Sequence, residues 1–194
     1  LKIEYMKLHF ALFLSLLCLN SIAIAQVKYE KETRVPIDDL PLRVKSLLPQ
    51  IEKDAKRIRY YHEFDGEKES FEVKLKKFGT HFSIEFTQEG VLEDIEILIS
   101  TAELPTPVLE TIGKQFQRHK LTRIQKQFTH PKGQDPKQTL QGVFNGLIRP
   151  TAYEIVINGK TNSGYKQVEF LIDINGKLLK KRNVITKDYE HVVY

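Results

Sequence analysis

The sequence FSIEFTQEGVL occupies residues 82–92, and a similar sequence, VEFLIDINGKL, occupies residues 168–178. In both, apolar and polar residues alternate up to a glycine, a pattern typical of a half-buried strand that enters a turn. Further upstream, Leu40-Pro41-x-x-Val44 and Leu104-Pro105-x-x-Val108 each open a segment in which apolar residues have helical spacing. The same order of helix, strands and glycine turn therefore occurs twice along the chain.

Each helical segment carries one apolar face. Its residues are Leu40, Val44, Leu47 and Leu48 in the first segment, and Leu104, Val108, Ile112 and Phe116 in the second. Asp38 and Asp39 are expected to cap the first helix, since aspartate side chains accept hydrogen bonds from the free N–H groups there. Pro49 is expected to end or kink this helix, because proline lacks the N–H that a helix needs.

Strands with alternating apolar residues follow each helix. They cover residues 58–63, 71–76, 81–86 and 95–99 in the first half, and 124–128, 153–157, 168–172 and 178–184 in the second. The short connections require antiparallel pairing, and one face of each strand is apolar. We predict an α+β fold with eight strands and two main helices: two tandem repeats, each a helix packed on one face of a four-stranded antiparallel sheet. The two sheets could join edge to edge or dock separately.

The predicted boundaries are a signal peptide at residues 1–25, a first repeat at 26–100 and a second repeat at 101–194. Residues 26–34 are polar and are expected to fray or to form an edge strand. Residues 130–150 are an insertion in the second repeat, and they favour a short amphipathic helix with Leu140, Val143, Phe144 and Leu147 on its apolar face. An insertion with apolar content is where we expect a specific partner contact.

Residues 1–25 have the three parts of a secretory signal peptide. Lys7 is the positive residue, residues 8–19 are almost all apolar, and Ala23-Ile24-Ala25 is a small-x-small cleavage site. We expect translation to begin at Met6 and cleavage to fall between Ala25 and Gln26, which predicts a periplasmic or secreted protein without membrane insertion after cleavage. An uncleaved anchor is the alternative, although the apolar run is shorter than the ~20 residues that span a bilayer.

Cys18 is the only cysteine, and it lies within this segment. Lipidation of Cys18 is the less favoured alternative, because Leu17 stands where a lipoprotein would have a small residue. The cleaved chain would then contain no disulfide, thiol nucleophile or thiolate metal site. The net charge is +5, but basic and acidic residues are interspersed, which favours an ordinary solvated surface and predicts no nucleic-acid partner.

The arrangement resembles the PepSY-like family of secreted bacterial proteins, whose fold is related to that of the beta-lactamase inhibitor protein. The resemblance rests on the two Leu-Pro-x-x-Val helix starts, the strands at 71–73 and 153–155 and the turns at 88–90 and 174–176, and it covers about residues 35–185. It implies helix-on-sheet units in tandem, outside the cytoplasm, with a binding or inhibitory role toward peptidases or other proteins. It supplies no catalytic residue, and residues 130–150 depart from it.

No motif predicts a catalytic or metal site. The histidines of the cleaved chain lack the spacing of metal ligands: His62, His81, His119, His130 and His191. The sequence at 173–176 predicts a hairpin turn rather than a calcium loop, because the loop's other acidic positions hold Leu171 and Arg182. A nucleophile elbow and a phosphate-binding glycine loop are both absent from the sequence. We therefore predict no catalytic residue, cofactor or metal.

The alternation places six polar residues on the sheet face that the helices leave open: Arg59, Tyr61, Lys74, Lys76, His81 and Glu85. Tyrosine and arginine are favoured at protein interfaces, so this face is a candidate partner-binding surface, with a plain solvated face as the alternative. We predict a secreted, non-enzymatic binding module that recognises or inhibits another extracytoplasmic protein, such as a peptidase or other hydrolase. The alternatives are a small-ligand carrier or enzyme with a cleft between the repeats, and a structural envelope protein; the oligomeric state is left open.

Overall fold

The structure, a computed structural model, describes residues 26–28, 30–66, 68–116, 118–161 and 164–184. Within these residues ten strands form one sheet in the order β1-β10-β9-β8-β7-β6-β5-β4-β3-β2. Neighbouring strands are antiparallel except at one edge, where β1 runs parallel to β10. The strands are β1 (Gln26–Lys28), β2 (Glu30–Val35), β3 (Lys56–Asp65), β4 (Lys68–Lys77), β5 (Thr80–Thr87), β6 (Leu92–Leu98), β7 (His119–Thr129), β8 (Ala152–Thr161), β9 (Gly164–Asp173) and β10 (Leu178–Val184).

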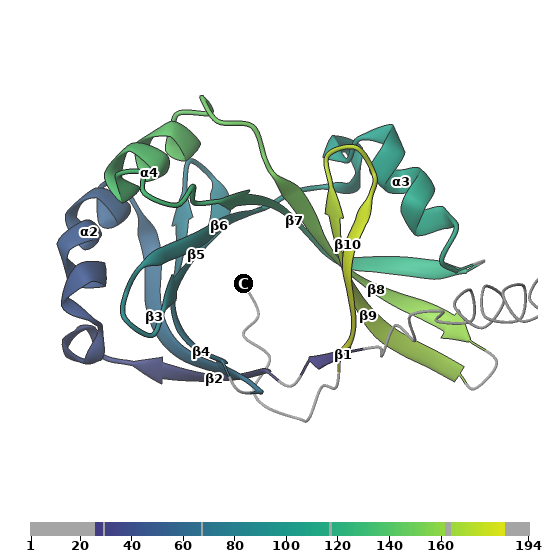
Figure 1. Cartoon of the computed structure of the whole chain (residues 1–194), viewed down its shortest axis with the longest axis horizontal. Coiled ribbons are helices and arrows are strands. Elements are labelled where there is room, and N and C mark those ends of the chain that lie inside the picture. The colour runs from purple at the N-terminus through teal and green to yellow at the C-terminus, as the bar shows by residue number, and fades with distance from the viewer. Residues whose placement is uncertain (1–25, 29, 67, 117, 162–163, 185–194) are drawn as a thin grey trace, which may run out of the picture.

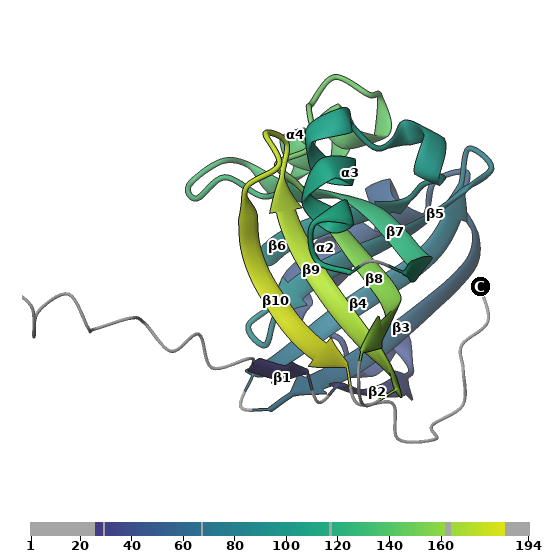
Figure 2. The ribbon, with the colours of Figure 1, turned by 90° about the vertical axis from the view of Figure 1, so that its right-hand side faces the viewer.

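The helices all lie on one face of this sheet. They are α2 (Leu42–Glu52), α3 (Thr106–Gly113) and α4 (Pro136–Phe144), with short 3-10 turns η1 (Ile37–Asp39) and η2 (Thr101–Glu103). In Figure 1 the sheet curls until its edge strands β1 and β2 come together, and the α-helices lie outside the curve. Figure 2 shows the strands of the second half crossing over those of the first. We call the inner surface, turned away from the helices, the concave face.

The α+β class and the antiparallel sheet are confirmed, and in the described residues the helices are the two main ones and the short one expected in residues 130–150. The eight strands expected within the two repeats are too few, because the segment that was expected to fray or to form an edge strand contributes β1 and β2. The two halves join edge to edge, through β6 and β7. The extra strands β1 and β2 come from the polar segment that precedes the first helix. They occupy the two edges of the sheet order, where a strand has one bonded neighbour and a polar composition is tolerated.

α2 packs on the first half of the sheet through Val44, Leu47, Leu48 and Ile51, which are all buried. Of the two outcomes expected at Pro49, the end of the helix is wrong, because α2 continues to Glu52, and the kink stays a prediction. Ile51 is fully buried in the core, and the Tyr60 hydroxyl on β3 donates a hydrogen bond to Glu52. These tertiary contacts hold the last turn although proline disfavours it.

Two further predictions about helix ends are wrong. Asp38 and Asp39 lie in η1 and do not cap α2, because an extra turn separates them from the helix. α3 ends at Gly113, so Phe116 lies beyond the helix whose apolar face it was expected to extend. Phe116 still packs on the core, since its ring lies edge-on to that of Phe170 at a centroid distance of 6.4 Å.

A glycine turn meets the start of a helix in each half of the chain. Gly90 has a φ of +77°, and a Cβ atom there would lie 2.8 Å from the Cβ of Pro41. Gly176 has a φ of +85°, and a Cβ atom there would lie 2.6 Å from the carbonyl oxygen of Pro107. Both turns therefore require glycine, for the left-handed backbone and for the close approach of the helix.

The insertion forms the predicted amphipathic helix, α4, but it packs on the first half of the molecule. Leu140 and Val143 are buried in the core that α2 also covers, and the Phe144 ring lies edge-on to Phe82 at 5.5 Å. Leu147 lies beyond the helix and is 78% exposed, which corrects its expected place on the apolar face. Most of the apolar content on which the expected partner contact rested is therefore used inside the fold.

The apolar core has two parts, and both lie on the helical side of the sheet. One lies under α2 and α4, and the other under α3. None of the helices in the described ranges is long and apolar enough to cross a membrane. Because the core takes up only the helical side, the concave face is left to polar side chains.

Candidate binding site on the concave face

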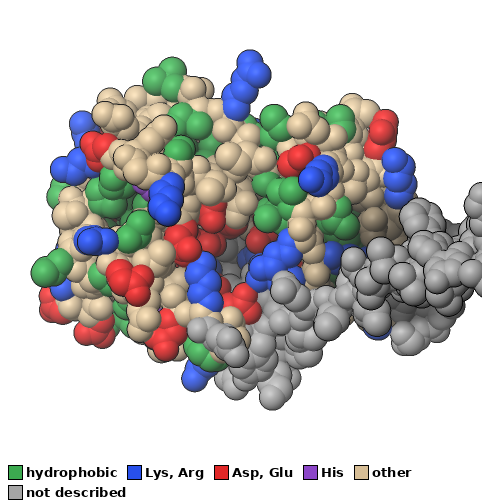
Figure 3. Space-filling model, in the orientation of Figure 1, with side chains coloured by type: hydrophobic (Ala, Val, Ile, Leu, Met, Phe, Trp, Pro, Cys, Tyr) green, Lys and Arg blue, Asp and Glu red, His purple; other side chains and the backbone are tan. Residues whose placement is uncertain are grey.

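Five strands each place a glutamate between two apolar neighbours. These are Glu72 on β4, Glu85 on β5, Glu96 on β6, Glu154 on β8 and Glu169 on β9, and we call them the strand glutamates. Side chains alternate along a strand, so the apolar neighbours enter the core and the glutamates lie on the concave face. The pairing register places Glu72 opposite Glu85 and Gln125 opposite Glu154. Figure 3 shows a hollow on this side, with acidic and basic side chains on its wall.

Four of the strand glutamates are almost completely buried. Their exposed fractions are 5% for Glu72, 4% for Glu96, 8% for Glu154 and 3% for Glu169, whereas Glu85 keeps part of its side chain accessible. Charged side chains are rarely buried unless paired, because the loss of hydration must be offset. Each buried carboxyl group therefore needs a cation, a hydrogen-bond donor or a proton.

Two arginines neutralise one side of the concave face. Arg182 on β10 donates hydrogen bonds to Glu169 and to Asp65 on β3, the latter at 2.7 Å. Arg123 on β7 lies 2.8 Å from Glu154. Burial alone would lower the pKa of Arg182, but the neighbouring carboxylates, Glu169 above all, outweigh this effect and raise the pKa. These ion pairs place a cation beside each of the buried carboxyl groups of Glu154 and Glu169.

Lys74 neutralises the opposite side. Its ammonium group lies 2.7 Å from Glu32 and 3.0 Å from Glu72. The Tyr61 ring lies against this ammonium at 5.1 Å, and the Ser83 hydroxyl donates a hydrogen bond to Glu72. Glu72 is therefore held by groups of the chain itself.

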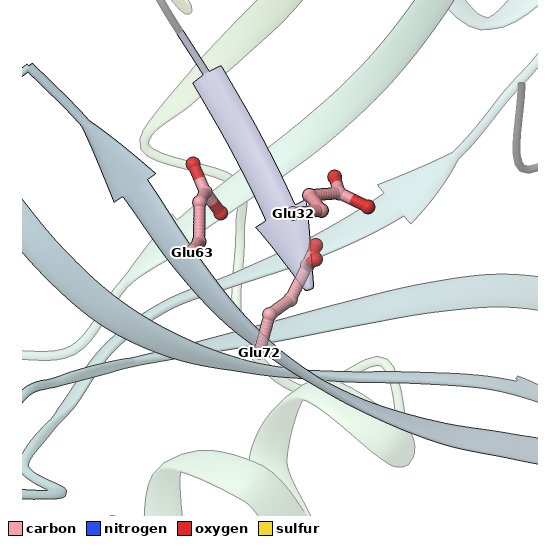
Figure 4. A group of neighbouring side chains, drawn as sticks. All are labelled: Glu32, Glu63 and Glu72. Atoms are coloured by element: carbon pink, nitrogen blue, oxygen red, sulfur yellow. The ribbon is translucent and has the colours of Figure 1, made fainter. Parts of the chain in front are cut away.

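The same region contains a candidate cation site. Glu32, Glu63 and Glu72 offer carboxylate oxygens within 4.8 Å of one another (Figure 4). Such a set would suit calcium, which takes oxygen ligands at about 2.3–2.6 Å. However, the Lys74 ammonium already pairs with two of the three carboxylates, so a cation of the chain takes the place that a metal would need. The prediction that the protein binds no metal stays a prediction.

Glu85 differs from Glu72, Glu154 and Glu169 because no cation forms an ion pair with it in the described ranges, and Lys68 acts on it only through its charge. Within the described ranges its carboxyl group has no hydrogen bond and no ion pair. Burial raises its pKa well above the usual value, and the charges of Glu96, Glu72, Glu154 and Asp94 raise it further. The surrounding protein therefore removes most of the water around the Glu85 carboxyl group, although solvent still reaches part of the side chain.

Gln125 binds Glu96, one of the carboxyl groups that raise the pKa of Glu85, and it leaves an acceptor unused. Its side chain is 4% exposed, and its Nε2 donates a hydrogen bond of 2.6 Å to Glu96. Its Oε1 is buried and has no hydrogen-bond partner in the part of the chain that the structure describes. A buried acceptor without a donor is unusual in folded proteins.

The six residues predicted from the sequence all lie on the concave face. Arg59 pairs with Lys74, Tyr61 with Glu72, and Lys76 with His81 in the strand register, and Glu85 lies at the centre. Tyr61 and Lys74 are buried, and Lys74 is engaged by carboxylates of the chain. Burial lowers the pKa of His81, and the charges of Lys76 and Arg57 lower it further. Partner binding by these residues stays a prediction.

Sequence reasoning missed the other strand glutamates, although the sequence contains a signal for them. Each stands between two apolar residues in a strand, as in Phe71-Glu72-Val73 and Ile95-Glu96-Ile97. On a flat sheet this alternation indicates only a solvated face. Recurrence of glutamate, rather than of mixed polar residues, at the middle of five strands was the available clue.

The remaining sequence predictions concern the histidines, the second turn and the leader. Asp173 accepts hydrogen bonds from the N–H groups of Asn175 at 2.9 Å and Lys177 at 2.8 Å, which confirms the hairpin turn between β9 and β10. His62 lies 3.1 Å from Glu69 and contacts the Phe71 ring. The signal peptide at residues 1–25 and His191 lie outside the described residues.

Solved structures with a similar fold come from Bacteroides. A DUF2874 family protein from Bacteroides uniformis matches with a TM-score of 0.52 and 12% identity, over 77% of this chain and 93% of that one. A protein described as periplasmic, from Bacteroides eggerthii, matches with a TM-score of 0.50 and 13% identity, over 74% of this chain and 88% of that one. A BLIP-like protein from Bacteroides fragilis has a TM-score of 0.48 and 15% identity, over 78% of this chain and 92% of that one.

Identities this low support a shared fold and not a shared function. No protein-family model matches the sequence, and no curated protein matches it either. The chain therefore shares its fold with the Bacteroides uniformis and Bacteroides eggerthii proteins, while the relation to the beta-lactamase inhibitor protein and the PepSY-like assignment stay predictions.

Proposed function

We propose that this is a non-enzymatic binding protein that works outside the cytoplasm, and that its concave face holds part of another extracytoplasmic protein. The observation that carries the proposal is the gathering of charged groups from five strands on a sheet face that none of the described helices covers. A face that served stability alone would gain nothing from buried charge, since apolar side chains of similar volume often stabilise as well or better. The signal-peptide pattern of residues 1–25 supports the location.

The resemblance to PepSY-like proteins suggests recognition or inhibition of a peptidase or another hydrolase. We also infer that residues 26–100 and 101–194 are two repeats of one unit. The contacts of Gly90 with Pro41 and of Gly176 with Pro107 support this inference, because each half sets the same kind of turn against the start of its helix.

An enzyme or small-ligand carrier is the second candidate. It is favoured by the raised pKa of Glu85 near carboxyl groups that pair with Lys74 and Arg123, because acid–base catalysis uses carboxyl groups in contrasting environments. A surface pocket of about 480 Å³ does not support it: residues 34–37 and 58–60, all in the first half, line this pocket, and no strand glutamate does.

Site-specific photo-crosslinking tests the leading proposal. A photoreactive amino acid replaces Lys76 or Asn158 on the concave face, or Leu42, which is 82% exposed on α2. The full chain with its leader is produced in its source cells and irradiated, and covalent adducts are identified by mass spectrometry. The Leu42 position is the matched control, since it samples the helical side of the same molecule.

We expect a discrete protein adduct from the concave positions and none from Leu42. An adduct from Leu42 alone would place the partner on the helical side and contradict the proposal. If no position gives an adduct and the purified chain binds a small molecule saturably, the second candidate is favoured.

A further inference from the structure

The middle of the concave face is acidic and is not balanced by the chain's own cations. Lys74 pairs with carboxylates on one side, and Arg123 and Arg182 pair with them on the other. Between these groups lies Glu85, which has neither a hydrogen bond nor an ion pair within the described ranges. Lys68 on β4 acts on Glu85 only through its charge, and it is itself bonded to Glu93 at 2.8 Å.

Two further acceptors belong to this centre, a carboxylate and an amide oxygen. Glu96 and Gln125 lie on the neighbouring strands β6 and β7, joined by the bond from Gln125 Nε2 to Glu96. The buried Oε1 of Gln125 has no partner in the described part of the chain. Because no donor of the described chain reaches this buried oxygen, it leaves an acceptor for a donor from outside the chain.

We propose that this centre binds a lysine or arginine side chain of the partner protein, with Glu85, Glu96 and the Oε1 of Gln125 as acceptors. The proposal rests on the proposed function, and it names the chemistry that the partner must present. An ammonium group supplies three N–H donors and a guanidinium group five, all with positive charge. Glu85, the accessible member, is where the side chain would enter.

A metal ion fits this centre less well than a basic side chain. In the described ranges, the only carboxylates whose oxygens converge within 4.8 Å are those of Glu32, Glu63 and Glu72, and Lys74 already serves that set. Glu85 and Glu96 do not form such a set with a third acidic group. A guanidinium group can bridge acceptors that are farther apart, because its donors point outward from an extended plane.

The raised pKa of Glu85 extends the pH range in which a proton neutralises this carboxyl group in the free protein. Burial and the charges of Glu96, Glu72, Glu154 and Asp94 raise the pKa of Glu85, so its neutral form is favoured in the free protein. A basic side chain would stabilise the ionised form instead, since an opposite charge nearby lowers the pKa of a carboxyl group. Binding is therefore expected to release a proton.

Two labelled peptides of Gly and Ser that differ at three positions test the proposal. One carries arginine at these positions and the other carries citrulline, which keeps the shape and removes the charge. Fluorescence anisotropy gives their affinities for the purified chain from Gln26 to Tyr194, for Glu85→Gln and for Glu110→Gln, an exposed control on α3. Calorimetry in buffers of different ionisation enthalpy counts the protons released.

We expect the arginine peptide to bind at least about tenfold more tightly than the citrulline peptide, a difference of ~1.4 kcal/mol. Glu85→Gln should lose about tenfold in affinity and should no longer release a proton, whereas Glu110→Gln should leave both unchanged. Equal binding of the two peptides, or binding unaffected by Glu85→Gln, would overturn the proposal. Calcium that binds in a Glu85-dependent manner and displaces the arginine peptide would overturn it in favour of a metal.

The two proposals can fail separately. Photo-crosslinking from Lys76 is repeated with Glu85→Gln in the same chain. An adduct that persists at full yield would leave the binding function standing and remove the basic side chain as its determinant. An adduct lost with Glu85→Gln and kept with Glu110→Gln would support both.

Discussion

At the scale of single residues, Glu85 is the clearest conflict between burial and charge. Its pKa is raised by burial first, and then by Glu96 on β6, Glu72 on β4 and Glu154 on β8, with Asp94 adding to them. Below the ordinary glutamate value of 4.5 the carboxyl group is protonated in both folded and unfolded chains, and it has no effect. As the pH rises through 4.5 toward the raised folded value, the unfolded chain loses this proton first, so the contribution of Glu85 to stability falls.

We therefore expect Glu85→Gln to stabilise the free protein near neutral pH, because it removes a carboxylate that the fold disfavours. Thermal unfolding should show a Tm increase of about 3 °C, which corresponds to ~1 kcal/mol for a chain of this size. The increase should shrink as the pH falls toward 4.5. Glu110→Gln, on the exposed side of α3, should change the Tm little at any pH. A lower Tm for Glu85→Gln at neutral pH would contradict this prediction and would mean that the fold stabilises the ionised carboxyl group of Glu85.

At the scale of secondary-structure elements, the helices depend on the glycine turns that touch them. Gly90→Ala places a methyl group against Pro41 in a backbone of φ +77°. The left-handed backbone alone costs about 1–2 kcal/mol for an alanine, and the contact with the helix adds to it. We expect urea unfolding to show a loss of roughly 2–3 kcal/mol for Gly90→Ala, and a similar loss for Gly176→Ala.

Gly66 provides the matched control for this experiment. Its φ is +70°, but a Cβ atom there would meet nothing within 4 Å. Gly66→Ala should therefore show only the backbone part of the loss, ~1 kcal/mol. Equal losses for Gly66→Ala and Gly90→Ala would mean that the approach of α2 to its turn contributes nothing to stability.

Elements could be predicted from the sequence where local pattern and tertiary packing agree. Alternation located β4 and β5 because each has one face toward a helix, and the same pattern placed Glu85 on the other face. The predicted helix ends were wrong at Pro49 and Phe116. α2 continues past Pro49 because distant strands hold its last turn, whereas α3 ends before Phe116. The site was only partly predictable, because curling of the sheet brings the charges of both Glu72 and Glu154 to act on Glu85, and no local pattern encodes curling.

At the scale of the whole molecule, one short segment joins the two ends of the sheet order. β1 pairs with β10 and β2 pairs with β3, although a single residue separates β1 from β2 in the chain. The ion pair between Arg182 on β10 and Asp65 on β3, at 2.7 Å, connects the same two ends. The curl that creates the hollow is therefore held by main-chain pairing and by one charged bridge.

This arrangement predicts different effects for the two partners of the bridge. Arg182→Met would leave Glu169, which is 3% exposed, without its main cation, and it should cost about 3 kcal/mol in the free energy of unfolding. Asp65→Asn breaks only the connection between the edges, and because Asp65 is partly exposed it should cost about 1 kcal/mol or less. Hydrogen exchange should nevertheless accelerate in β10 and β3 of Asp65→Asn while β5 and β6 keep their protection. Exchange that accelerates equally in all four strands would show that Asp65 acts through global stability alone, and that main-chain pairing by itself keeps the sheet curled.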